Sequence, residues 1–391
     1  MITIKLKGRI DSNNAGAFEE EVLKNLAKGA SDGVVFDASD LEYISSAGLR
    51  VLMKVLKAQG AENVSVIEVS SEIYDIFEIT GFTELLKIKK KMRRISVDGC
   101  EVIGKGFYGT VYRIDADTII KVYDSPDCLP MIENEKKMAR LAFLKGIPTA
   151  ISYDIVRVGD SYGSVFELLK AKSFNDLIIE KPESIDETIR TYVDFIKLVH
   201  GTSAGEGELP SARARYLDHL ECIKGYLDDD MYKGLKDLLE SVAKENGIVH
   251  GDIQMKNVMM VDNEPMLIDM DTLSMGSPIF DFAGLYVTYR EFAEDEPDNT
   301  MNFLGIDNAT AGKIWEGILR DYFGTDDPDT LKDLSDKIRL VAAVRFMYIV
   351  TASDLKDGDL GQKRIANTKE HISKLLGLVR DLVFIDKNTD C

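Results

Sequence analysis

The chain has 391 residues, more than one typical domain, so two or three compact units are expected. Its net charge is −19, and the acidic excess lies after residue 95, which argues against nucleic acid as a partner. Four dispersed cysteines, none in a Cys-x-x-Cys motif, and four histidines argue against a zinc or dithiol site and favour reduced thiols in the cytoplasm.

The first ninety residues alternate between strand and helix patterns. Ile2, Ile4 and Leu6 alternate with polar residues, so a strand is expected from the start, with no signal peptide before it. The later apolar spacing predicts further elements in this order: a helix over 15–27, a strand over 33–37, a helix around 49–56, a strand over 64–69 and helical turns over 73–82. This order predicts helices packed on a sheet.

A basic run over residues 87–94 follows this region. Such a run is usually a solvated edge or linker, and contact with a membrane or nucleic acid is the alternative. We interpret it as an edge or linker and expect neither a membrane nor a nucleic acid as partner. The domain boundary is placed near Ile95, so the first domain is 1–95.

Three glycines, Gly104, Gly106 and Gly109, lie between two predicted strands, and a third strand follows over 118–123. Glycine allows positive φ and lets backbone N–H groups approach phosphates. A dinucleotide-binding motif would need a helix directly after the glycines, whereas a strand follows here. The context therefore matches a glycine-rich flap between strands, as in kinases.

Lys121 stands in the third of these strands, among apolar residues. It is either an edge lysine that faces water or a cation for nucleotide phosphates, held by a carboxylate. A helix is predicted over 131–144, and Glu135 falls on its apolar stripe. An inward glutamate needs a partner, and Lys121 would supply one.

The segment 248–259 combines apolar flanks with a His-Gly-Asp core that contains Asp252, and Asn257 follows five residues later. A second apolar run ends at Asp269. An aspartate can accept the proton of an attacking hydroxyl, and amide and carboxylate oxygens suit Mg²⁺. Asp and Asn as plain turn formers are the alternative. The joint occurrence of these features favours phosphoryl transfer.

Residues from about 97 to 384 resemble the aminoglycoside phosphotransferase and choline kinase branch of the protein-kinase-like fold, because His250-Gly251-Asp252 matches its His-Gly-Asp motif. The resemblance implies a two-lobed fold, with an N-lobe over 96–170 and a helical C-lobe over 171–391. It implies ATP and Mg²⁺ as cofactors. It also implies these roles: Asp252 as catalytic base, Lys121 with Glu135 on the ATP phosphates, Gly104, Gly106 and Gly109 over them, Asn257 and Asp269 on Mg²⁺, and the backbone of Glu167 and Leu169 on adenine.

Two departures from the family pattern concern the acceptor. Gln254 stands where many relatives have His and protein kinases have Lys. Only 12 residues separate Asp269 from Asp281, and no Ala-Pro-Glu lies there. This leaves little room for a protein-kinase activation segment, so a small-molecule acceptor is favoured.

The segment 41–52 ends one predicted strand and opens a helix, with Ser45 and Ser46 at the junction. Either serine can serve as an N-cap. The segment also resembles the phosphorylation loop of STAS domains, the fold of anti-sigma-factor antagonists. That resemblance covers about residues 1–90 and implies Ser46 as the phosphate acceptor. It also implies a protein partner.

The expected fold is therefore α/β and α+β, with a STAS domain before a two-lobed kinase-like domain. The expected function is ATP- and Mg²⁺-dependent phosphorylation of a small-molecule hydroxyl, with a regulatory STAS module. One alternative is a signalling protein whose kinase-like domain phosphorylates Ser46 or a partner protein. A nucleotide-sensing pseudokinase is a further alternative, which the complete set of catalytic positions does not support.

Overall fold

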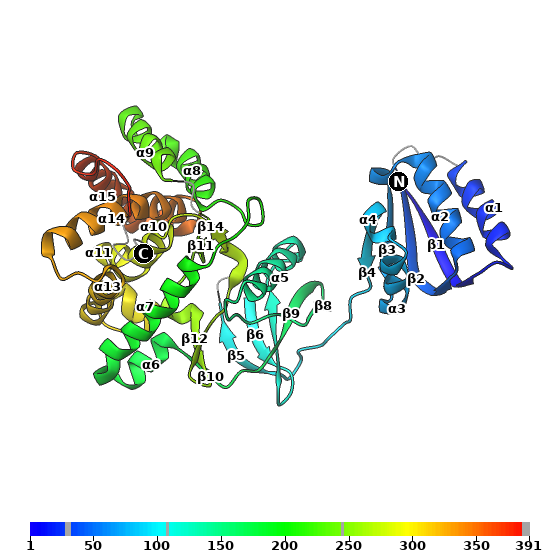
Figure 1. Ribbon diagram of the computed structural model, residues 1–391, viewed down its shortest axis with the longest axis horizontal. Coiled ribbons are helices and arrows are strands. Elements are labelled where there is room, and N and C mark those ends of the chain that lie inside the picture. The colour runs from blue at the N-terminus through cyan, green and yellow to red at the C-terminus, as the bar shows by residue number, and fades with distance from the viewer. Residues whose placement is uncertain (28–32, 107–108, 244–245, 385–391) are drawn as a thin grey trace. The chain divides into compact units, whose positions relative to one another are not determined.

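The computed structural model describes residues 1–27, 33–106, 109–243 and 246–384, which form two compact units (Figure 1). One unit comprises Met1–Asp98 with Ile155–Gly163, and the other comprises Gly99–Asp154 with Ser164–Cys391. Within the described ranges, no helix is both long enough and apolar enough to span a membrane.

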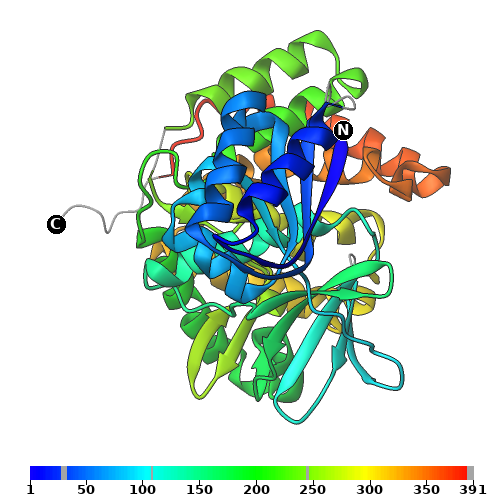
Figure 2. The same ribbon diagram turned by 90° about the vertical axis from the view of Figure 1, so that its right-hand side faces the viewer.

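The N-terminal unit is a parallel sheet with helices packed on it, as the βα pattern predicts. The strand order follows the chain: β1 (Ile2–Ile10), β2 (Val34–Ile44), β3 (Val64–Val69) and β4 (Lys87–Lys90). The helices of this unit are α1 (Ala15–Leu26), α2 (Ser46–Gln59), α3 (Ser71–Ile79) and α4 (Phe82–Leu85). Helices α1 and α2 pack side by side over one face of the sheet (Figures 1 and 2). Leu6, Phe36, Val66 and Phe77 are fully buried in the core.

The basic run contributes the last strand of this sheet. Lys87, Lys89 and Lys90 of β4 are exposed, and only Ile88 is half-buried. Lysines on a sheet edge discourage pairing with another chain. The prediction of a solvated edge agrees with this placement, and the strand itself went unpredicted.

A five-stranded sheet in the order β5-β6-β7-β9-β8 follows in the chain. Its strands are β5 (Glu101–Lys105), β6 (Gly109–Arg113), β7 (Thr118–Tyr123), β8 (Asp154–Val158) and β9 (Ser161–Glu167). Helix α5 (Leu129–Leu144) follows β7, and its apolar stripe is buried. This arrangement brings β7 and α5 together next to the glycine segment.

The rest of the second unit is helical. Its helices are α6 (Phe174–Glu180), α7 (Ile185–Gly201), α8 (Ala212–Ile223), α9 (Asp229–Ser241), α10 (Ile279–Tyr286), α11 (Phe292–Asp295), α12 (Asn299–Leu304), α13 (Asn308–Phe323), α14 (Pro328–Thr351) and α15 (Gly358–Leu376). Five short strands complete it: β10 (Ala171–Ser173), β11 (Ile248–Val249), β12 (Val258–Val261), β13 (Glu264–Leu267) and β14 (Ser274–Met275).

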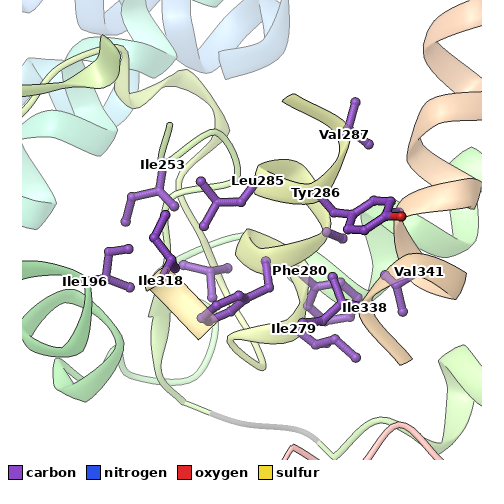
Figure 3. Close-up of a cluster of buried hydrophobic side chains, with 14 of the residues drawn as sticks. Ile196, Ile253, Ile279, Phe280, Leu285, Tyr286, Val287, Ile318, Ile338 and Val341 are labelled. Carbon is purple, nitrogen blue, oxygen red and sulfur yellow. The ribbon is translucent and has the colours of Figure 1, made fainter. Parts of the chain in front are cut away.

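Helix α10 lies at the centre of the C-lobe core, where Phe280 and Leu285 are buried (Figure 3). Ile196 of α7, Ile318 of α13 and Ile338 of α14 surround it (Figure 3). Ile253 belongs to the same cluster and lies in the His-Gly-Asp loop. The core therefore anchors the loop that carries Asp252.

Candidate active site

The His-Gly-Asp loop lies between two short strand pairs. Strand β11 pairs with β14 before the loop, and β12 pairs with β13 after it. The β12–β13 hairpin closes through Asp262 and Asn263, whose φ values are 49° and 68°. Asp and Asn are among the residues that tolerate this left-handed turn. Both ends of the loop are thus held by backbone pairing.

Asp252 is half-buried in this loop and is held by neighbouring side chains. Its Oδ2 accepts hydrogen bonds from Gln254 Nε2 at 3.0 Å and from Asn257 Nδ2 at 2.9 Å. Asn257 Nδ2 also donates to the Asp252 carbonyl oxygen at 2.9 Å. The amide nitrogen of Asn257 therefore faces Asp252.

The carboxylate of Asp281, in the first turn of α10, holds the backbone of the His-Gly-Asp loop by hydrogen bonds. It accepts hydrogen bonds from the backbone N–H of His250 at 2.8 Å and of Gly251 at 2.5 Å. His200 Nε2 lies 3.0 Å from the same carboxylate, and His200 Nδ1 lies 2.8 Å from the Tyr322 hydroxyl. Burial alone would raise the pKa of Asp281, but the hydrogen bond and charge of His200 prevail and lower it. His200 thus makes structural contacts that hold Asp281 in place.

Position 251 requires a glycine because of its backbone conformation. Its φ is +86°, and a Cβ there would lie 2.8 Å from the Thr272 carbonyl oxygen. A side chain would therefore be strained and would also clash with the backbone. The glycine of the His-Gly-Asp motif lets the loop approach the segment that follows Asp269.

Lys121 on β7 joins two carboxylates from different parts of the chain. Its Nζ lies 3.5 Å from Glu135 Oε1 on α5 and forms a closer ion pair with Asp269. Glu135, only 8% exposed, also accepts a hydrogen bond from the Tyr123 hydroxyl at 2.7 Å. Burial alone would lower the pKa of Lys121, but Asp269 and Glu135 raise it above its usual value. Lys121 is therefore a cation at neutral pH.

Asp269 follows β13 in a left-handed conformation, with φ 59° and ψ 64°. A positive φ at a non-glycine residue is strained and often marks a functional site. The backbone N–H of Ile268 donates to the Asn257 carbonyl oxygen at 3.0 Å, which keeps this strand end beside the His-Gly-Asp loop. The fold thus brings the two predicted Mg²⁺ ligands, Asn257 and Asp269, to adjoining backbone segments.

The glycine segment turns between β5 and β6, and the Gly106 N–H donates to the Gly109 carbonyl oxygen at 2.9 Å. None of Gly104, Gly106 and Gly109 has a positive φ. A Cβ on Gly104 or Gly106 would find only ordinary contacts, whereas a Cβ on Gly109 would lie 2.1 Å from the Val122 carbonyl oxygen. Phe107 and Tyr108 lie outside the described residues.

The predicted hinge connects β9 to β10. Strand β9 ends at Glu167, and Leu169 follows it in a half-buried position. The Leu168 N–H donates to the Asp117 carbonyl oxygen at 2.8 Å, and the Tyr153 hydroxyl donates to Glu167 Oε2 at 3.2 Å. The segment is therefore tethered at both its backbone and its side chain.

Two arginines near Asp252 were missed by sequence reasoning. Arg345 on α14 donates to the Gly251 carbonyl oxygen, and its Nη2 lies 3.5 Å from Asp252 Oδ1. Arg215 on α8 donates from Nη1 to the Thr272 carbonyl oxygen at 2.7 Å. A signal for Arg345 existed, because it interrupts the apolar run 340–351. A buried charge in such a run calls for a partner.

In the N-terminal unit, the two candidate serines have different surroundings. Ser45 is the N-cap of α2, and its Oγ accepts a hydrogen bond from the Ala47 N–H at 3.2 Å. Ser46 is the first residue of the helix and is exposed. The capping role therefore belongs to Ser45, and the Ser46 side chain faces solvent.

Family models match both parts of the chain. The model described as the phosphotransferase enzyme family matches residues 99–311, more than half of the chain, and the STAS domain model matches residues 1–94. A curated relative is the candidate anti-sigma factor antagonist BtrV of Bordetella bronchiseptica. It is 36% identical over 90 residues, which are 22% of this chain and 77% of the relative.

Solved structures resemble the second unit at low identity. The streptomycin–ATP ternary complex of the phosphotransferase APH(2'')-IIa shares 13% identity over 79% of this chain and 98% of its own, with a TM-score of 0.49. A choline/ethanolamine kinase family protein from Mesorhizobium loti shares 17% identity over 72% of this chain and 92% of its own, with a TM-score of 0.46.

Proposed function

Because the chain belongs to the phosphotransferase enzyme family and carries a STAS domain, we propose that it is an ATP- and Mg²⁺-dependent kinase of a small-molecule hydroxyl. The STAS domain would regulate this activity through a protein partner. We place the protein in the cytoplasm.

The observation that supports this proposal most is the ion-pair cluster around Lys121. Lys121 forms ion pairs with both Glu135 and Asp269. Asn257, which donates a hydrogen bond to Asp252, lies on the backbone segment beside Asp269. Phosphoryl transfer needs charge neutralisation and positioning more than covalent chemistry. This cluster supplies both.

Each residue then has a role in the transfer. Lys121, oriented by Glu135, would contact the ATP phosphates. Asn257 Oδ1 and the Asp269 carboxylate offer the oxygen ligands that Mg²⁺ prefers, and the ion would neutralise phosphate charge. Asp252 would accept the proton of the acceptor hydroxyl through Oδ1 or Oδ2.

Substitution of the base tests the proposal. Asp252→Asn keeps the side-chain shape but removes the proton acceptor, so ATP turnover should fall by roughly 10²–10⁴-fold. ADP release and the melting temperature are measured together. Asp262→Asn, at the exposed β12–β13 turn, is the matched control and should keep its turnover. Full turnover in Asp252→Asn with an intact fold would contradict the proposal.

A second candidate function is phosphorylation of the STAS domain by the kinase domain. It is favoured by the exposed Ser46 side chain at the helix N-terminus, where a phosphate is electrostatically tolerated. The acceptor would then be a protein hydroxyl, in the same chain, in another copy or in a partner.

Intact-mass measurement after incubation with ATP and Mg²⁺ separates the two functions. A STAS kinase would add one phosphate to the wild type and to Ser45→Ala, but none to Ser46→Ala. Ser45→Ala is a matched control because its hydroxyl caps the same helix. Equal phosphate incorporation in all three proteins would exclude Ser46 as the acceptor.

A further inference from the structure

Arg215 lies next to the proposed base, on the first turn of α8. Its Nη1 donates to the Thr272 carbonyl oxygen at 2.7 Å, and a Cβ built on Gly251 would lie 3.0 Å from the same nitrogen. Gly251 directly precedes Asp252. The guanidinium of Arg215 is therefore placed between the His-Gly-Asp loop and the segment after Asp269.

This guanidinium has few partners in the protein. Across the described part of the chain, the guanidinium of Arg215 makes one hydrogen bond and no ion pair with a carboxylate. A guanidinium has five N–H donors, and burial is unfavourable for a cation that lacks a counter-ion. Burial, together with the nearby charge of Arg345, lowers the pKa of Arg215 below its usual value. The carboxylates of Asp271 and Asp281 act on the charge of Arg215, but they form no ion pair with it in the described residues, so the guanidinium keeps unused N–H donors.

Arg345 adds a second cation to this place. It is also half-buried, and its Nη2 lies 3.5 Å from Asp252 Oδ1, a long contact for an ion pair. Arg345 also donates to the Gly251 carbonyl oxygen, so both guanidinium groups lie against Gly251. Two arginines close together are stabilised when an anion lies between them or beside them.

His219 stands one helical turn after Arg215 on α8. Its ring stacks on Tyr348, with 4.0 Å between the ring centroids and 10° between the planes. Its Nδ1 is buried and has no hydrogen-bond partner among the described residues. Burial, and then the charges of Arg345 and Arg215, lower the pKa of His219 to about 4, so the ring is neutral at pH 7. We call Arg215, Arg345 and His219 the arginine corner.

We propose that the arginine corner binds an anionic group of the acceptor, so that the acceptor is an alcohol carrying a phosphate or carboxylate group. This proposal rests on the proposed kinase function. The N–H donors of Arg215 that the protein does not use can bind an anionic group, whereas a cationic group cannot accept them.

The transfer itself leaves the corner unchanged. The acceptor hydroxyl oxygen forms a bond to the γ-phosphorus of ATP, its proton passes to Asp252, and the bond from that phosphorus to the bridging oxygen breaks, so that ADP leaves. The arginine corner holds the other end of the acceptor. Arg215 is therefore a specificity residue, and Asp252 is the proposed base.

Calorimetric titration of the full chain tests this proposal. The protein is first saturated with ADP and Mg²⁺ and then titrated with four matched alcohols: glycerol, 2-amino-1,3-propanediol, glycerate and glycerol 3-phosphate. We expect at least one of the two anions to bind roughly tenfold or more tightly than the neutral and cationic alcohols. The two anions distinguish a carboxylate from a phosphate. The preferred anion should bind more weakly as salt is raised, and glycerol should not.

The corner is then altered at one residue. Arg215→Gln should lose roughly tenfold or more of the anion affinity, whereas Arg213→Gln should keep it. Arg213 lies two residues earlier on the same helix, and its Nη1 donates to the Glu240 and Val242 carbonyl oxygens at 3.3 and 2.8 Å. If Arg215→Gln does not fold, Arg215→Lys replaces it, and it should retain part of the anion affinity.

Three results would overturn the proposal: no preference for the anions, no effect of the Arg215 substitution, or an equal loss in Arg213→Gln. Failure of the kinase function is read separately, as full ATP turnover in Asp252→Asn, which the titrations do not involve. The comparison of Arg215→Gln with Arg213→Gln needs no phosphoryl transfer, so it still tests the corner in that case.

Discussion

Single charged residues in the site depend on partners that come from distant parts of the chain. Lys121 meets Asp269, which lies 148 positions later, and Arg345 reaches Asp252 across 93 positions. Removing one member of such a pair leaves a charge without its counter-ion, which costs more than the pair itself contributes. The site is therefore sensitive to each of these residues and to the fold that brings them together.

The pH dependence of stability should show the contribution of His219. Burial lowers its pKa from 6.5 to about 4, so the unfolded chain binds a proton between these values more readily than the folded chain does. Its stabilising effect is present above pH 6.5 and is lost as the pH falls towards 4. We expect the melting temperature of His219→Phe, which keeps a ring beside Tyr348, to fall less between pH 7 and pH 5 than that of the wild type. Equal falls would contradict this assignment.

The glycine segment between β5 and β6 shows that strand pairing requires a glycine at one position and not at another. Gly109 opens β6 in contact with β7, where a Cβ would lie 2.1 Å from the Val122 carbonyl oxygen. A Cβ on Gly106, before it in the chain, would meet only the Gly109 carbonyl oxygen, at 3.8 Å. One glycine is thus needed for strand packing, and the other leaves open space.

Alanine should reduce stability at Gly109 and ATP binding at Gly106. Gly109→Ala should lose about 3 kcal/mol or more of the free energy of unfolding, because the backbone of β7 must move. Gly106→Ala should remain near wild-type stability but bind ATP less well, since the added methyl group narrows the space for phosphates. Thermal unfolding and the KM for ATP check both. Similar melting temperatures for the two variants would show that the strand packing is more tolerant than we infer.

The described residues of the two units form two separate buried cores. Phe36 lies in the core of the N-terminal unit, and Phe280 lies in that of the C-lobe. Each is at most 1% exposed. A unit with its own core can unfold as its own cooperative transition.

Scanning calorimetry should therefore show two transitions. Phe36→Ala should lower only the transition of the N-terminal unit, by about 3–5 kcal/mol in unfolding free energy. Phe280→Ala is the matched substitution in the other core and should lower only the second transition. A single transition that both variants shift equally would contradict independent unfolding.

Sequence patterns predicted the elements where local spacing carries the signal. The alternation at Ile2, Ile4 and Leu6 marked β1, and the stripe that includes Glu135 marked the buried face of α5. Strand β4 was missed because its lysines show no alternation that separates a strand from a solvated linker. Most side chains of an exposed edge strand face solvent, so its sequence does not show the alternation of apolar and polar residues that marks a half-buried strand.

The order of motifs by itself determined the kinase-like and STAS families and the identity of the candidate residues, because His-Gly-Asp, the glycines and the serine pair are local patterns. Only the tertiary structure decided that Lys121 contacts Asp269 as well as Glu135. It also decided that Ser45 caps α2 while Ser46 is exposed. The same holds for the positions of Arg215 and Arg345 on either side of Asp252. The arginine contacts join α8 and α14 to the His-Gly-Asp loop. These three segments are far apart in the chain, and the distances between them along the sequence follow no helix or strand period. The contacts follow from the packing of helices around the shared core, which one-dimensional patterns do not record.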